Sequence, residues 1–171
     1  PIGLGHATRD LAIINQLQLE SCKIFTGSSA VEFFHKNKIE AQDVYSPPRF
    51  DVKDGKLEKS LRWLWSYYKY YKHCKEVSSE IINKEKPKLI ISDEDFASVA
   101  IAQEKKIPNI VITDILETRF TSGFGGMIEK KMNKIMCEML NRANKVIIPE
   151  LGENQNNIIR TGPIVRKIQK N

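Results

Sequence analysis

Short apolar runs along the chain alternate with longer segments in which apolar residues recur at helical spacing. The short runs are rich in Ile and Val and end at Gly, Pro or polar residues, which is typical of buried strands. They predict strands at residues 23–27, 44–45, 88–92, 110–113, 146–149 and near 159. The helical spacing predicts helices at residues 6–19, 57–84, 96–104 and 128–143, with a short helix beginning near residue 28. Polar and glycine-rich stretches predict loops at residues 49–56 and 122–126.

This alternation predicts an α/β fold, a Rossmann-like doubly wound parallel sheet with helices on both faces. Sheets of this kind bind ligands just outside the carboxyl ends of their strands. The segments that follow those ends should therefore line one cleft. They are residues 3–9, 26–29, 46–54, 93–96 and 113–126.

The composition narrows the choice of partners only slightly. The 171 residues suffice for one domain with a proper core, and the net charge of +6 favours anionic partners. No nucleic-acid motif accompanies this charge, so a nucleic-acid partner is not expected. The three scattered cysteines form no C-x-x-C pair, which argues against a zinc site and favours a reduced, cytoplasmic setting. No apolar run is long enough to span a bilayer.

A glycine-rich turn at the start of the chain is the first candidate for chemistry. Gly3 and Gly5 permit tight backbone geometry, and the helix that follows offers free N–H groups to a phosphate or a hydroxyl-rich ligand. A dinucleotide fingerprint would need a third glycine where Thr8 stands. The second strand also ends without the acidic residue that would hold a ribose. The pattern disfavours an NAD-type site, although another Rossmann-like nucleotide-binding protein stays open.

His6 and Asp93 are the candidate catalytic pair. The positive end of the helix dipole disfavours a charged His6, and a neutral imidazole can act as a general base. Asp93 follows the strand at 88–92, so its carboxylate could orient the His6 ring. The alternatives are a histidine that merely packs and an aspartate that caps the next helix. Asp95 competes with Asp93 for both roles.

Other polar residues of the same cleft are weaker candidates. Thr8 and Arg9 belong to the segment of the glycine turn. Asp114 and Arg119 follow the strand at 110–113 and could bind substrate hydroxyls or an anionic group, or could be an ordinary turn and surface charge. The glycines of residues 122–126 suggest a mobile loop over the cleft, with a plain connection as the alternative.

The long helix at 57–84 carries more aromatic residues than one buried stripe needs. Trp65 falls outside its apolar stripes and shares a face with Lys69 and Lys72. Aromatic and basic residues together suit a membrane interface or a lipid-bearing acceptor. A buried contact with another domain would use the same residues.

Taken in order, the motifs are similar to those of a known family. Residues 1–9, with the sequence PIGLGHATR, resemble the opening loop of GT-B glycosyltransferases, above all the MurG-like and UDP-glycosyltransferase groups. The strand at 88–92 with Asp93, the following helix and Ile107-Pro108 look like the family's next segment. Gly162-Pro163 look like the dipeptide before its interdomain linker. The MurG loop has two glycines before its histidine, where Leu4-Gly5 stand here.

The resemblance implies that residues 1–171 are the acceptor-side, N-terminal domain, with the first strand missing and the C-terminal donor-binding domain absent. It implies inverting transfer of a sugar from a nucleotide sugar to an acceptor hydroxyl, with His6 as base, Asp93 as its partner and neither a metal nor a cofactor. The fragment alone should be inactive, and the acceptor could be lipid-linked at a membrane surface. The alternative is a non-catalytic subunit that recruits a separate catalytic partner. The expected substrate-binding residues are Gly3, Gly5, Thr8, Arg9, Asp95, Asp114 and Arg119.

Overall fold

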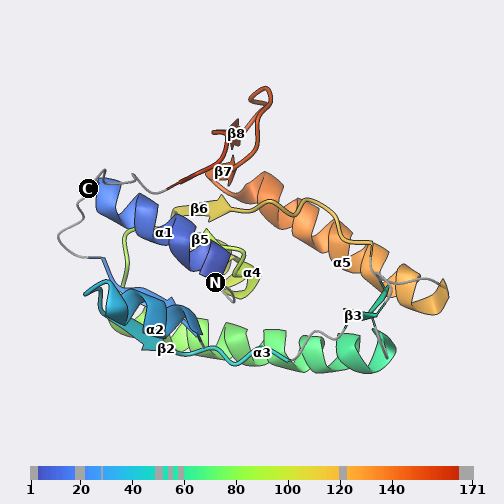
Figure 1. Cartoon of the computed structure of the whole chain (residues 1–171). Coiled ribbons are helices and arrows are strands. Elements are labelled where there is room, and N and C mark those ends of the chain that lie inside the picture. Colours follow the sequence, from blue (N-terminus) through green and yellow to red (C-terminus); the bar gives the residue numbers. More distant parts are fainter. Residues whose placement is uncertain are drawn as a thin grey trace.

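The structure is a computed structural model that describes residues 4–17, 22–27, 29–48, 52–53, 56–57, 60–119 and 123–165. Five helices and eight strands occur in these ranges (Figure 1). The helices are α1 (Leu4–Leu17), α2 (Ser29–Lys36), α3 (Ser60–Glu85), α4 (Phe96–Glu104) and α5 (Gly123–Arg142). The strands are β1 (Ile24–Thr26), β2 (Ala41–Asp43), β3 (Val52–Lys53), β4 (Lys56–Leu57), β5 (Ile90–Asp93), β6 (Asn109–Ile112), β7 (Lys145–Ile148) and β8 (Ile158–Arg160).

The main sheet has four parallel strands in the order β5-β6-β7-β8. A second parallel pair, β1-β2, and a small antiparallel pair, β3-β4, form separate sheets. Helices flank the parallel sheets, and each crossover between neighbouring strands of the main sheet carries a helix or a short loop (Figure 1). The predicted α/β class with parallel strands is therefore confirmed.

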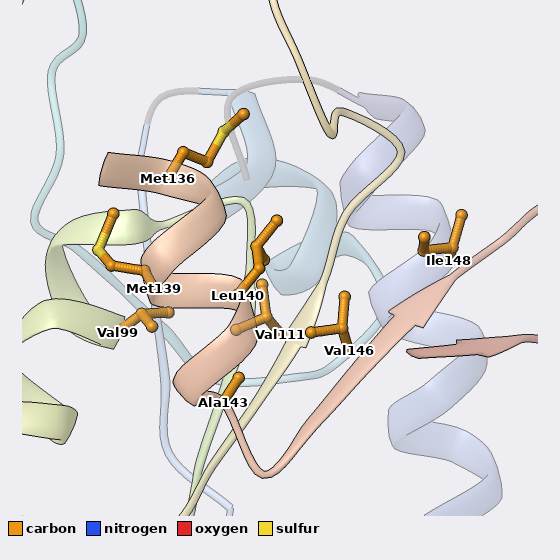
Figure 2. Close-up of a cluster of buried hydrophobic side chains, with 8 residues drawn as sticks. All are labelled: Val99, Val111, Met136, Met139, Leu140, Ala143, Val146 and Ile148. Carbon is orange, nitrogen blue, oxygen red and sulfur yellow. The ribbon is translucent and has the colours of Figure 1, made fainter. Parts of the chain in front are cut away.

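Two apolar clusters hold these layers together. The larger one joins α4, β6, α5 and β7 through buried aliphatic and methionine side chains (Figure 2). Its members are Val99, Val111, Met136, Met139, Leu140, Ala143, Val146 and Ile148. Full burial of a Val, Leu or Met side chain contributes about 1.5–3 kcal/mol, so this cluster fixes the helices against the sheet. The smaller cluster packs α1 on α2 and β2 through Ala7, Leu11, Ala30, Phe34 and Ala41.

Several predicted boundaries differ from the structure. Helix α1 begins at Leu4, so Gly5 lies inside its first turn rather than before it. Strand β2 ends at Asp43, just before the predicted strand at 44–45, and β3 and β4 lie in or beside the predicted polar loop at 49–56. These two strands have only two residues each, too short for a period-two pattern to be visible in the sequence.

The predicted glycine-rich loop at 122–126 is wrong for the residues that the structure describes. Helix α5 begins at Gly123 and includes Gly125 and Gly126. Gly123 has a φ of 60°, a left-handed conformation that glycine adopts at no steric cost, at the helix start. Gly125 is buried inside the helix. A glycine-rich stretch favours a loop, but the cost of glycine in a helix, about 1 kcal/mol per residue, is small against tertiary packing.

Candidate functional site

Six ionisable residues meet where α1 begins and where β5 and β6 end. We call this group the charged cluster. Parallel strands present their carboxyl ends at one edge, and the start of α1 lies against that edge beside β5 and α4 (Figure 1). These residues thus come together at the sheet edge where the sequence predicts a cleft. The members are His6, Arg9, Asp10, Asp93, Glu94 and Asp114.

Asp93 lies at the centre of the charged cluster, with only 3% of its side chain exposed. Its Oδ1 lies 3.1 Å from His6 Nδ1, and Arg9 donates from Nε to Oδ2 at 3.0 Å and from Nη2 to Oδ1. Burial alone would raise the pKa of Asp93, but hydrogen bonds from His6, Arg9 and Asp10 outweigh burial and lower it. Asp93 is therefore a buried carboxylate that stays ionised at neutral pH.

His6 has two neighbours competing for the same nitrogen. Its Nδ1 lies 3.1 Å from Asp93 Oδ1 and 2.8 Å from Arg9 Nη2. A guanidinium can only donate, so Nδ1 cannot both donate to Asp93 and accept from Arg9. The hydrogen bond with Asp93 is the largest influence on the pKa of His6, and it raises that pKa against burial and the positive charge of Arg9. We therefore assign the Nδ1 proton to the hydrogen bond with Asp93, which leaves Nε2 as the nitrogen able to accept a proton.

The helix start was expected to disfavour the charged form of His6, but the pKa of His6 is raised, because its hydrogen bond with Asp93 favours the charged form. A helix dipole changes the energy of a nearby charge by about 0.3–1 kcal/mol at an exposed site. A direct hydrogen bond to the buried Asp93 carboxylate favours the imidazolium more strongly, and the pKa of His6 lies above its ordinary value. The sequence identified both residues, but the balance between dipole and carboxylate depends on their contact.

Sequence reasoning missed two members of the charged cluster, Asp10 and Glu94, and Glu94 is the one that approaches His6 Nε2. Its backbone has a φ of 57°, a left-handed conformation that costs a non-glycine residue about 1–2 kcal/mol. Its Oε1 accepts hydrogen bonds from Thr113 Oγ1 at 3.2 Å and from the Asp114 backbone N–H at 3.3 Å. Its Oε2 lies 3.6 Å from His6 Nε2. The one signal in the sequence is its place between two candidate aspartates directly after a buried strand.

Burial also affects the ionisation of Glu94. Burial raises the pKa of Glu94 to about 7, and the neighbouring Asp114 carboxyl raises it further. The same contact lowers the pKa of Asp114, which is half-exposed and lies 3.8 Å from Arg9 Nη1. Near neutral pH, the side of His6 that bears Nε2 therefore faces a carboxyl that is only partly ionised.

Asp95 forms the N-cap of α4. Its Oδ1 accepts from the backbone N–H groups of Ala97 at 3.1 Å and Ser98 at 3.3 Å. Its Oδ2 accepts from the Tyr45 hydroxyl at 2.9 Å, and that hydroxyl also lies 2.9 Å from Ser78 Oγ. Of the two roles that the sequence left open between Asp93 and Asp95, the cap falls to Asp95 and the contact with His6 to Asp93. Binding of substrate by Asp95 stays a prediction.

The other predicted substrate residues differ in their surroundings. Gly5 lies in open space, because a Cβ added there would meet nothing within 4 Å. Thr8 donates its hydroxyl to the Leu4 carbonyl at 2.7 Å, within α1. Arg119 pairs with Glu117 at 2.9 Å, and its side chain is 83% exposed. Gly3 lies outside the described residues. Substrate contacts at all these positions stay predictions.

Trp65 and Tyr68 form an exposed aromatic surface on α3. Their rings stack at 5.8 Å, with Lys69 Nζ 5.4 Å from the Trp65 ring centre and Lys72 Nζ 5.9 Å from the Tyr68 ring centre. More than half of each aromatic side chain is exposed. Over the described ranges, no helix is long and apolar enough to cross a membrane, and no group of His, Cys, Asp and Glu side chains suits a metal ion.

One solved structure with a similar fold is the crystal structure of MurG from Acinetobacter baumannii. The two chains share 13% sequence identity, with a TM-score of 0.52 over 97% of this chain and 44% of that one. No protein-family model matches the sequence, and no curated protein matches it. The likeness shows a Rossmann-like fold similar to that of the matched part of MurG, and this chain spans less than half the length of that structure.

Proposed function

We propose that this chain is the acceptor-binding part of an inverting glycosyltransferase that moves a sugar from a nucleotide sugar to an acceptor hydroxyl. The observation that carries the proposal is the His6 imidazole, held through Nδ1 by the buried Asp93 carboxylate at 3.1 Å. This arrangement leaves Nε2 free to take a proton at the carboxyl edge of the sheet, where such folds bind ligands. The glycosyltransferase-like fold supports the same class of reaction.

The proposed reaction is a single displacement at the anomeric carbon. Neutral His6 accepts the proton of the acceptor hydroxyl at Nε2 while the hydroxyl oxygen attacks the anomeric carbon of the donor. The bond between that carbon and the nucleoside diphosphate breaks, and the diphosphate leaves with the bonding electrons. Asp93 stabilises the imidazolium that forms. A single displacement inverts the configuration of the anomeric carbon.

The raised pKa of His6 has a consequence for the rate. Below that pKa the imidazole is already protonated and cannot accept the hydroxyl proton. Turnover should therefore increase as the pH rises through the pKa of His6. A higher pKa also makes the neutral imidazole a stronger base once it forms.

The nucleotide sugar needs a second binding surface, and we propose a C-terminal donor-binding domain as this partner. The MurG chain extends well beyond the part that this chain matches. The donor is then a substrate, and no separate cofactor takes part. Contact of the Trp65 surface with a membrane or a lipid-linked acceptor stays a prediction.

The test is a screen of nucleotide sugars for transfer by the full-length protein, with His6→Ala compared with wild type. Loss of a positioned general base typically costs 10²–10⁴-fold, so we expect turnover to fall by about a hundredfold or more. His73→Ala is the matched control, because His73 is an exposed histidine on α3. Turnover close to wild type in His6→Ala would refute the base role. Transfer that needs a separate catalytic chain would instead support a recruiting subunit.

A further inference from the structure

The His6 ring has a carboxyl group on each of its two nitrogen sides, and the proposed function uses only one of them. Asp93 accepts the hydrogen bond from Nδ1. On the other side, Glu94 Oε2 lies 3.6 Å from Nε2, beyond the 2.7–3.2 Å of a hydrogen bond. The Glu94 side chain is only 17% exposed, so this oxygen has little access to water.

The second oxygen of Glu94 fixes the orientation of the carboxyl. Oε1 accepts from Thr113 Oγ1 at 3.2 Å and from the Asp114 backbone N–H at 3.3 Å. Both donors come from the segment after β6, while Glu94 itself follows β5, so two neighbouring strands hold the carboxyl in place. The left-handed backbone of Glu94, with a φ of 57°, directs the side chain from that turn. Oε2 is thereby aimed at His6.

A hydroxyl that gives its proton to Nε2 must come within about 2.8 Å of it. The attacking oxygen then lies beside Glu94 Oε2, since Nε2 and Oε2 are 3.6 Å apart. Two hydrogen-bond acceptors at this spacing match a ligand that carries two neighbouring hydroxyls. A lone alcohol would satisfy Nε2 and leave the poorly hydrated Oε2 without a donor, which is unfavourable.

We propose that Glu94 selects the acceptor by accepting a hydrogen bond at Oε2 from a second hydroxyl next to the attacking one, so that the site takes a vicinal diol in preference to an isolated alcohol. This assignment rests on the proposed function, in which Nε2 receives the proton of the attacking hydroxyl. Glu94 is then a specificity-determining residue, and it fixes which of the two hydroxyls attacks. Burial raises the pKa of Glu94 to about 7, which agrees with an oxygen shielded from water.

The experiment measures binding of two small probes to the full-length protein and needs no turnover. The probes are trans-1,2-cyclohexanediol and cyclohexanol, titrated while the His6 imidazole resonances are followed by NMR at a pH where His6 is neutral. A hydrogen bond to a charged group is worth roughly a factor of ten or more in affinity, so wild type should bind the diol about tenfold more tightly.

Glu94→Gln should abolish this preference. Its amide oxygen would keep the hydrogen bonds from Thr113 and Asp114, which turns the NH2 group, a donor, towards His6. Glu104→Gln is the matched control, because it removes the same charge from an exposed glutamate at the far end of α4 and should keep the preference. Glu94→Asp, which keeps the charge but shortens the side chain, provides a second variant if Glu94→Gln does not fold.

The outcomes separate this inference from the proposed function. Equal affinity of wild type for the two probes overturns the role of Glu94, and so does a diol preference that survives in Glu94→Gln. A diol preference without transfer from any nucleotide sugar would leave Glu94 as a ligand-selecting residue and contradict the glycosyltransferase proposal. Transfer from a nucleotide sugar without any diol preference would support the glycosyltransferase proposal and contradict the role of Glu94.

Discussion

Asp93 and Asp95 lie two residues apart at the same strand-to-helix turn, but their carboxylates bind different partners. Asp93 ends β5 and interacts with three side chains of α1, namely His6, Arg9 and Asp10. Asp95 binds the backbone of its own helix and one tyrosine. The first carboxylate orients an imidazole at the sheet edge, whereas the second stabilises the start of α4.

The residue between them explains the difference. Glu94 adopts the left-handed conformation, with a φ of 57°, so the chain turns sharply between the two aspartates. Asp93 then stays in the register of the sheet and reaches α1, while Asp95 lies at the first turn of α4, where its carboxylate accepts hydrogen bonds from free backbone N–H groups. The role of an acidic residue after a strand thus depends on which hydrogen-bond donors its carboxylate can reach, and the backbone conformation decides this.

A loss of stability at every pH should follow from Asp95→Ala. It removes the N-cap of α4, which typically costs about 1 kcal/mol, and takes away one acceptor of the Tyr45 hydroxyl. We expect the free energy of unfolding to fall by about 1–2 kcal/mol, measured by urea denaturation. The His6 resonances of the folded protein should stay unchanged. A stability equal to wild type would contradict the capping role.

A change in stability that depends on pH should follow from Asp10→Asn. Burial raises the pKa of Asp10 to about 8, and contact with Asp93 adds to this effect. Between about pH 4 and pH 8 folded Asp10 holds a proton that the unfolded chain has lost, so its contribution to stability falls as the pH rises. Above pH 8 the wild type carries a buried extra charge beside Asp93 that the variant lacks.

We therefore expect Asp10→Asn to gain stability relative to wild type between pH 5 and pH 9, by about 1 kcal/mol or more. His6 and Glu94 also have raised pKa values, so stability declines as the pH rises through them as well, but both groups are present in both proteins. Urea denaturation at the two pH values measures the difference. Parallel stability curves for wild type and variant would show that Asp10 is not buried against Asp93.

The sequence was sufficient to predict the class of fold and the place of the site. The strands β5, β6 and β7 are apolar on both faces, so their runs were clear, and the rule for parallel sheets placed His6 and Asp93 at one edge. The contact between His6 Nδ1 and Asp93 Oδ1 at 3.1 Å agrees with that expectation. Their catalytic roles stay proposals.

The features that the sequence could not predict depend on contacts between residues far apart in the chain. The charge of His6 follows from Asp93, which is 87 residues away, and not from the local helix dipole. Glu94 reaches His6 only through an uncommon backbone conformation, for which no residue preference gives a signal. The hydrogen bonds of Arg9 to Asp93, 84 residues away, are a further contact of this kind, and substrate binding by Arg9 stays a prediction.

The most direct test of this account is the pKa of His6, measured by NMR titration of the imidazole in wild type, Asp93→Asn and Asp95→Asn. The account predicts a wild-type pKa above the ordinary value of 6.5, because the Asp93 hydrogen bond raises it. Asp93→Asn should lower that pKa clearly, and Asp95→Asn, which removes the same charge two residues away, should leave it nearly unchanged. The same shift in both variants, or no shift in Asp93→Asn, would contradict the separation of the two aspartates into a site residue and a helix cap.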